Sequence, residues 1–183
     1  MNSFKLLLGA GIAVLATGCS TTNSIPYKAS TANVIAIQQT LEPQGKKVSV
    51  GKVAMASGVE ESPTCRLMGP IKVAPGKALS QYIKEAFVEE LFMAKAYSPS
   101  SKSVIRAKIE NIKFSSVSPA SWEIAMSVRS TSSPGYKVSI NYGFDTSWDA
   151  YSACKNVADA FGPAVQALLG KVVTHSQFST LAN

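Results

Sequence analysis

Hydrophobic and polar residues alternate in three segments of the second half of the chain, which is the pattern of β-strands with one buried and one solvated face. The three segments are residues 104–114, 122–129 and 136–144. The first changes parity near Glu110-Asn111, which predicts a β-bulge there. Residues 132–135 (SSPG) form a turn between the other two, so we expect an antiparallel hairpin. A further strand is predicted over residues 46–56, with a bulge or bend at Gly51.

Two other segments repeat hydrophobic residues at steps of three and four, as amphipathic helices do. The first covers residues 78–96, and the second covers residues 150–173 with Asp149 as its N-cap. Both helices need an apolar surface on which to pack, and the predicted sheet offers one such face. The pattern therefore predicts an α+β two-layer sandwich, in which a mainly antiparallel sheet carries two helices on one face.

The first residues have the three zones of a bacterial secretion signal. Lys5 supplies a positive charge, and residues 6–15 form an apolar run that is too short to remain as a helix across ~30 Å of hydrocarbon. The small residues Ala16-Thr17-Gly18 then precede Cys19, and this arrangement resembles the lipobox of bacterial lipoproteins. The resemblance implies that residues 1–18 are cleaved off and that Cys19 carries the lipid of the mature protein.

The residue after the lipobox bears on the membrane that the protein reaches. Ser20 stands where an aspartate would resemble the signal for retention in the inner membrane. We therefore expect a lipid-anchored protein on the outer membrane, facing the periplasm.

The rest of the chain divides into a tether, one domain and a tail. Residues 19–45 begin with a stretch rich in Ser, Thr and Asn and are predicted to be a flexible tether, with a short strand at residues 34–38. Residues 46–175 contain the periodic segments and are predicted to form the folded domain. Residues 176–183 are expected to be a frayed tail.

Charge and cysteine content fit an exported protein. The chain has 18 Lys and Arg against 11 Asp and Glu. A basic balance usually indicates nucleic acid, but an exported protein meets anionic lipid, lipopolysaccharide and peptidoglycan instead, and the charge could equally serve solubility alone. With Cys19 assigned to lipid, Cys65 and Cys154 remain as an even pair in an oxidising compartment. We predict a disulfide between them, the alternative being two buried thiols.

The chain offers few groups for catalysis. It has one histidine, His175, and its two remaining cysteines are far apart, so neither a His-rich metal site nor a zinc knuckle is expected. It has no G-x-S-x-G motif and no glycine-rich phosphate loop. We expect no enzyme activity, no metal and no cofactor. The alternative is a periplasmic enzyme or inhibitor with an atypical site around Glu60, Glu61 and the loop of Cys65.

Several exposed positions are candidates for contact with a partner. Trp148 lies outside the strand alternation, near the start of the last helix, whereas Trp122 and Tyr142 occupy the apolar parity of their strands. The polar side of the predicted sheet is basic and faces solvent or a partner. The candidate contact residues are Arg106, Lys108, Arg129, Lys137, Asn141 and Trp148.

Residues 154–161 (CKNVADAF), with the following Ala164-Val165 and Leu168-Leu169, resemble the closing helix of small outer-membrane lipoproteins of the YajG-like kind. The order of elements over residues 46–175 is also similar. The resemblance implies a periplasm-facing accessory lipoprotein. We therefore expect a non-enzymatic envelope protein that binds a protein or glycolipid partner in an accessory or structural role. An auxiliary lipoprotein of a lipid ABC transporter, with a broadly similar architecture, is the alternative.

Overall fold

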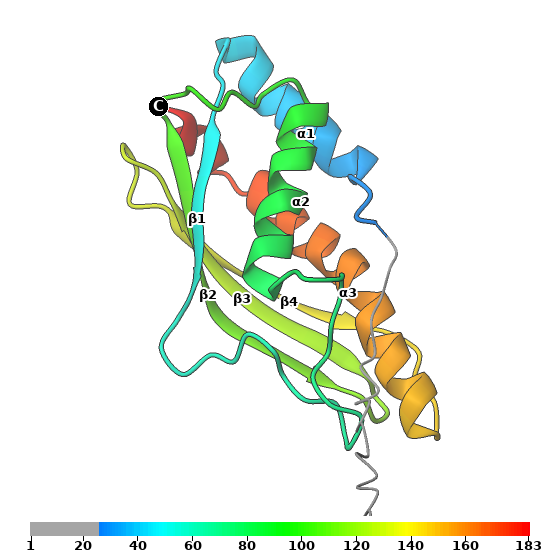
Figure 1. Ribbon diagram of the computed structural model, residues 1–183. Helices are drawn as coiled ribbons and strands as arrows, with labels where there is room; N and C mark the ends of the chain where they lie inside the picture. The colour runs from blue at the N-terminus through cyan, green and yellow to red at the C-terminus, as the bar shows by residue number, and fades with distance from the viewer. Residues whose placement is uncertain (1–25) are drawn as a thin grey trace, which may run out of the picture.

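The computed structural model describes residues 26–183 (Figure 1). Cys19 and the predicted signal over residues 1–18 lie outside this range. The described residues form an open four-stranded mixed sheet with three α-helices, which confirms the expected α+β class. Within residues 26–183, no helix is both long enough and apolar enough to cross a membrane.

The sheet has the strand order β1-β2-β3-β4. Its strands are β1 (Ser49–Met55), β2 (Val104–Ser115), β3 (Ser121–Arg129) and β4 (Tyr136–Gly143). The β2–β3 and β3–β4 pairs are antiparallel, and β1 pairs with β2 in parallel. The register shifts between Val50 and Val53 and between Ile109 and Asn111, where the two bulges were predicted.

The apolar face of the sheet packs against helices α2 (Leu79–Met93) and α3 (Ala150–Val173), as Figure 1 shows. Helix α2 is the crossover that a parallel pair such as β1 and β2 requires. Trp122 is fully buried under α3, and its indole N–H donates a hydrogen bond to the carbonyl of Val157 over 2.8 Å. Burial alternates along β3 as its sequence pattern predicts, so one face of the sheet is apolar and covered by these two helices.

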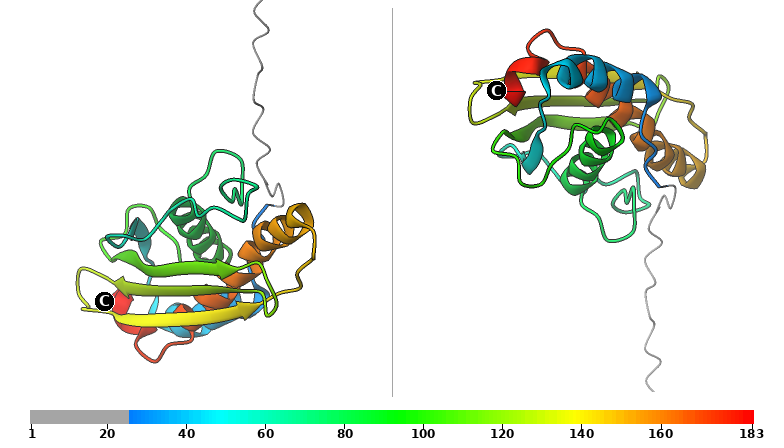
Figure 2. Two further views of the ribbon diagram at one scale, coloured as in Figure 1. Left: turned by 90° about the horizontal axis from the view of Figure 1, so that it is seen from below. Right: turned by 90° about the horizontal axis from the view of Figure 1, so that it is seen from above.

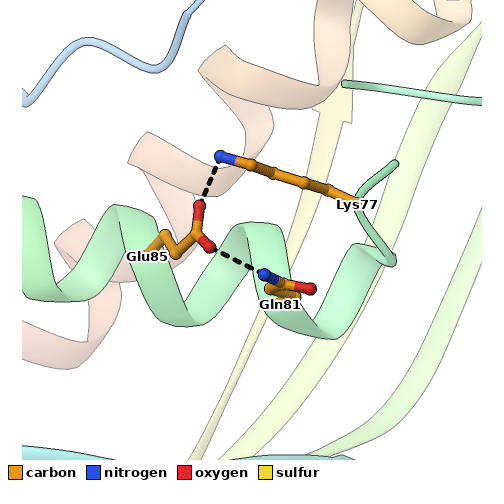
Figure 3. Close-up of polar contacts among 3 residues, drawn as sticks. All are labelled: Lys77, Gln81 and Glu85. Carbon is orange, nitrogen blue, oxygen red and sulfur yellow. Dashed lines mark hydrogen bonds and ion pairs between the residues drawn. The ribbon is translucent and has the colours of Figure 1, made fainter. Parts of the chain in front are cut away.

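Helix α2 starts without a capping side chain of its own. Its N-cap residue is Ala78, and the carboxylate of Glu61 instead accepts the backbone N–H of Ser80 over 2.9 Å. On the exposed side, Glu85 accepts hydrogen bonds from Lys77 and Gln81, the latter over 2.9 Å (Figure 3). The hydrogen bond from Lys77, followed by that from Gln81, holds the pKa of Glu85 below its ordinary value.

The prediction of a tether over residues 19–45 is wrong for its second half, and so is the strand at residues 34–38. Helix α1 (Thr31–Leu41) begins after the N-cap Ser30 and packs against α2 and α3 (Figure 2). Ile37 and Leu41, one helical turn apart, are buried. The few apolar residues of this segment suffice because they contact the two longer helices, so residues 26–183 contain three α-helices and not two.

The prediction of a frayed tail over residues 176–183 is also wrong. The 3₁₀-helix η2 (Phe178–Ala182) buries Phe178 and Leu181 in the main core. The hydroxyl of Ser103 donates to the carbonyl of Ala182 over 3.3 Å and so ties this end to the start of β2. Packed structure therefore extends beyond residues 46–175 in both directions.

Candidate anion-binding site on the sheet

The outer face of the sheet, on the side away from α2 and α3, contains a groove of about 430 Å³. Strands β1, β2 and β3 form its floor, and the connection between β3 and β4 forms one wall. Among residues 26–183, four cationic side chains line the groove, and no acidic side chain does. The four cations are Lys52, Arg106, Lys108 and Arg129. We call this set of four residues the basic groove.

Two of these cations are placed directly opposite each other. Arg106 on β2 pairs with Arg129 on β3 in the antiparallel register, so their Cβ atoms are about 4.5–5.5 Å apart. Like charges in this position destabilise a sheet. Among residues 26–183, neither arginine has an acidic partner within ion-pair distance. The pair therefore concentrates positive charge at a cost in folding free energy.

Lys108 is the one groove cation with an acidic neighbour in the described residues. Its ammonium lies 3.1 Å from a carboxylate oxygen of Glu110, which also accepts a hydrogen bond from the hydroxyl of Ser127 over 2.7 Å. The hydrogen bond from Ser127, and after it that from Lys108, lowers the pKa of Glu110, so this carboxylate stays ionised. Lys52 and the two arginines keep their charge uncompensated.

The wall of the groove is apolar and firmly held. Gly135 has φ +80°, and a Cβ there would lie 1.7 Å from the carbonyl oxygen of Val128, so only glycine permits this tight return of the chain. Tyr136 follows, and its side chain points to the opposite face of the sheet, under α3. Its hydroxyl donates to the carbonyl of Val172 over 2.7 Å, and its ring stacks on His175 with centroids 3.8 Å apart, which fixes the chain next to the wall. Burial raises the pKa of Tyr136, which keeps the phenol protonated as a donor.

The composition of the groove defines the ligand that it suits. Arginine and lysine bind phosphate and carboxylate groups, and arginine does so through two parallel hydrogen bonds. Pro134 and Gly135 of the wall offer carbon surface beside these charges. A phosphate or carboxylate on a carbon skeleton, such as a phosphorylated sugar, matches both parts.

The six candidate contact residues do not all lie at the groove. Arg106, Lys108 and Arg129 line the groove, and Lys137 lies beside it, opposite Ser127. Asn141 lies farther along β4, opposite Glu123, and Trp148 is fully exposed in the loop between β4 and α3.

Sequence reasoning missed one cation of the groove and its wall. Lys52 lies in the bulge of β1, between Val50 and Val53, and the residues after Gly51 resume the alternation in shifted parity, which was a usable signal. The wall of Pro134, Gly135 and Tyr136 depends on a turn that folds back onto β3, and residue types alone do not determine that packing.

Cys65 and Cys154 form a disulfide, with their Cα atoms 5.8 Å apart, in agreement with the sequence prediction.

The two glutamates of the alternative enzyme site have separate environments. Glu61 caps α2 through Ser80, whereas Glu60 is exposed in the loop. Within residues 26–183, no three His, Cys, Asp or Glu side chains gather in a way that could hold a metal ion.

No family model matches the chain, and no curated protein has significant sequence similarity to it. Among solved structures, the fold is similar to the crystal structure of protein XCC0632 from Xanthomonas campestris, which is described under the family DUF330. The TM-score is 0.51 and the sequence identity is 11%, over 84% of this chain and 94% of that protein. At this identity the likeness concerns the fold, so the chain shares its arrangement of mixed sheet and helices with a DUF330 protein of a Xanthomonas species.

Proposed function

We propose that this chain is a non-enzymatic, lipid-anchored protein of the bacterial outer membrane that binds an anionic envelope partner in its basic groove. The pairing of Arg106 with Arg129 supports this proposal most directly. Two unpaired cations side by side lower the stability of the sheet, and a bound anion removes that repulsion. The function therefore gives a reason for an arrangement that folding alone disfavours.

The lipobox supports the location in the envelope. Cys19 follows a short apolar run and three small residues, and Ser20 does not resemble an inner-membrane retention signal. The disulfide between Cys65 and Cys154 fits an oxidising compartment such as the periplasm. The similarity of the closing segment to YajG-like lipoproteins points in the same direction. The helix layer packed on one face of the sheet leaves the groove on the opposite face open to a partner.

The proposed partner is a glycolipid whose sugar head group carries phosphate. Lipopolysaccharide is abundant at this membrane and provides phosphate groups on a sugar skeleton, which suit the cations and the apolar wall of the groove. An acidic protein segment offers carboxylates of similar charge, and binding measurements with both kinds of ligand distinguish the two sources.

The test compares charge-reversal variants of the full chain. We expect Arg106→Glu combined with Arg129→Glu to weaken binding to lipopolysaccharide at least tenfold. Lys113→Glu is the matched control, because Lys113 is exposed on β2 opposite Glu123 and does not line the groove. Dephosphorylated lipopolysaccharide is expected to bind weakly to the unaltered chain.

Two results would contradict this function. Equal affinity of the double variant and of Lys113→Glu would show that the groove is not the binding site. Binding of polyglutamate with no binding of lipopolysaccharide would exclude the glycolipid and leave an acidic protein as the partner. The anchor is tested separately, because Cys19→Ser must abolish labelling by a fatty-acid probe.

A further inference from the structure

Four large apolar side chains project into solvent at one end of the molecule. Leu67 and Trp148 are fully exposed, Val117 is 61% exposed and Tyr151 is 60% exposed. They lie in the loop between β1 and α2, in the β2–β3 turn, in the loop after β4 and in the first turn of α3. In Figure 1 these segments meet at the end opposite the marked C-terminus. We call these four residues the apolar loop surface.

The guanidinium of Arg66 holds this surface together. It donates to the hydroxyl and carbonyl of Ser116 over 3.1 and 2.8 Å, and to the carbonyls of Trp148 and Ser147 over 3.1 and 3.4 Å. Arg66 itself has φ +49°, a conformation that is uncommon for residues other than glycine. Three loops are therefore joined through one side chain next to the disulfide of Cys65.

The position of these side chains has no explanation in the packing of the domain. An exposed tryptophan contributes no burial to folding, yet the loop that carries Trp148 is fixed by Arg66. Tryptophan and tyrosine concentrate at membrane–water interfaces, where their rings contact lipid and their polar atoms stay hydrated. Clustered exposed apolar residues with a polar rim mark contact surfaces for proteins or membranes.

The length of chain outside the described structure favours a membrane as the occupant. Residues 20–25 separate Cys19 from Pro26, and this link spans at most about 25 Å. Pro26 shares a small cavity with Asp159 and Gly162 of α3. Asp159 is about 14 Å along the helix from Ala150, beside the apolar loop surface. A bilayer that holds the lipid of Cys19 is therefore within reach of that surface.

We infer that the apolar loop surface inserts into the interface of the phospholipid leaflet to which the chain is anchored. The inference rests on the anchor of the proposed function and not on the anion-binding groove. Contact at the loop end orients the domain and restricts its rotation about the short link from Cys19. The protein then contacts the same membrane in two ways, through the lipid of Cys19 and through the side chains of the apolar loop surface.

The fluorescence of Trp148 can report this contact, because the chain has two tryptophans and the other, Trp122, is fully buried. The acylated full chain is mixed with phosphatidylcholine vesicles that contain brominated lipid, and the floated fraction is examined by fluorescence. We expect the emission of Trp148 to be quenched and shifted to shorter wavelength. Trp148→Phe reports the background of Trp122, and Leu67→Ser with Val117→Ser should reduce the quenching severalfold.

Phe92→Ser is the matched control, because Phe92 is 67% exposed on α2 and lies outside the apolar loop surface. It should leave the quenching unchanged. Floated protein whose Trp148 is not quenched would overturn the membrane contact and leave both the anchor and the groove standing. A chain that does not float would contradict the anchor and the contact together, whereas binding of lipopolysaccharide in solution tests the groove independently.

Discussion

The side-chain amide of Asn33 donates hydrogen bonds to both carboxylate oxygens of Glu90, over 2.9 and 3.1 Å, and thereby joins α1 to α2. The same nitrogen lies 2.9 Å from the carbonyl oxygen of Gln166 on α3. Gly170 leaves the room for this contact, because a Cβ there would lie 2.9 Å from the amide oxygen of Asn33. One buried amide thus joins three helices.

Asn33→Ala should destabilise the fold by about 1–3 kcal/mol, because it leaves the buried carboxylate of Glu90 with fewer hydrogen bonds. Tyr27 and the backbone of Ser30 would remain as donors, over 2.6 and 3.3 Å. Urea unfolding measures the loss. Asn141→Ala is the control, since Asn141 is exposed, and its effect should stay within about 0.5 kcal/mol. Similar losses in the two variants would contradict a special role for Asn33.

Glu90 should make the fold more stable in acid than at neutral pH. Burial raises its pKa above the ordinary 4.5, although the hydrogen bonds from Tyr27 and Asn33 act in the opposite direction. The folded state then binds the proton more tightly than the unfolded state, so this contribution is complete below about pH 4.5 and is lost as the pH rises through the folded-state pKa. The melting temperature across this range should vary less in Glu90→Gln than in the unaltered chain.

Glu85 lies on the same helix and should act with the opposite sign. Its pKa is lowered, so its contribution is present above about pH 4.5 and is lost as the pH falls through the folded-state value. Because the side chain is partly exposed, this contribution is small. Glu85→Gln should therefore lower the melting temperature slightly near neutral pH and leave the melting temperature in acid unchanged. A loss that is largest in acid would contradict this assignment.

Removing the disulfide should weaken the whole fold. Cys65 and Cys154 are 89 residues apart in sequence, and a loop of that length contributes about 4–5 kcal/mol in the chain-entropy model. Cys65→Ser with Cys154→Ser should lower the free energy of unfolding by this amount and so lower the urea concentration at the midpoint of unfolding. Added reductant should no longer change the midpoint of this double variant. An unchanged midpoint in the double variant would show that the bridge adds nothing to stability.

Phe178 should behave as a core residue despite its place near the end of the sequence. Its side chain is 1% exposed, so Phe178→Ala should cost about 3–5 kcal/mol of unfolding free energy. Phe92→Ala provides the comparison, because Phe92 is 67% exposed and should change stability very little. A small effect of both substitutions in urea unfolding would contradict the docking of η2.

Arg129→Gln should stabilise the free protein and weaken ligand binding. It removes the repulsion with Arg106, which is worth about 0.2–1 kcal/mol, and keeps a long polar side chain on the sheet. Thermal unfolding without ligand measures the gain, and titration with lipopolysaccharide measures the loss. A variant that loses stability would show that Arg129 serves the fold and not a ligand.

The strands and two of the helices follow from local pattern. Alternation located β2, β3 and β4, and the parity break near Glu110 predicted the bulge that the register shows. These features depend on which face of each segment is apolar, and that property can be read from a single stretch of sequence. The cysteine pair required the additional step of assigning Cys19 to lipid.

Helix α1 and the buried C-terminal turn depend on distant partners. From the sequence alone, Asn33 is typical of a polar linker, and its role depends on Glu90 and Gln166, which are distant in sequence. Phe178 packs in the core, but no repeat of apolar residues around it predicts that burial. The direct pairing of Arg106 with Arg129 likewise depends on the exact register of β2 and β3, which the bulge between Ile109 and Asn111 shifts.

The open strand order leaves β1 and β4 as the edges of the sheet in residues 26–183. An exposed edge can pair with the edge of another molecule and lead to aggregation, and a lysine on the edge strand discourages such pairing. Lys52 on β1 and Lys137 on β4 are both exposed there. Replacing either with an uncharged residue would therefore remove a safeguard against self-association, so variants that probe the charge of this face keep their solubility best when they carry glutamate.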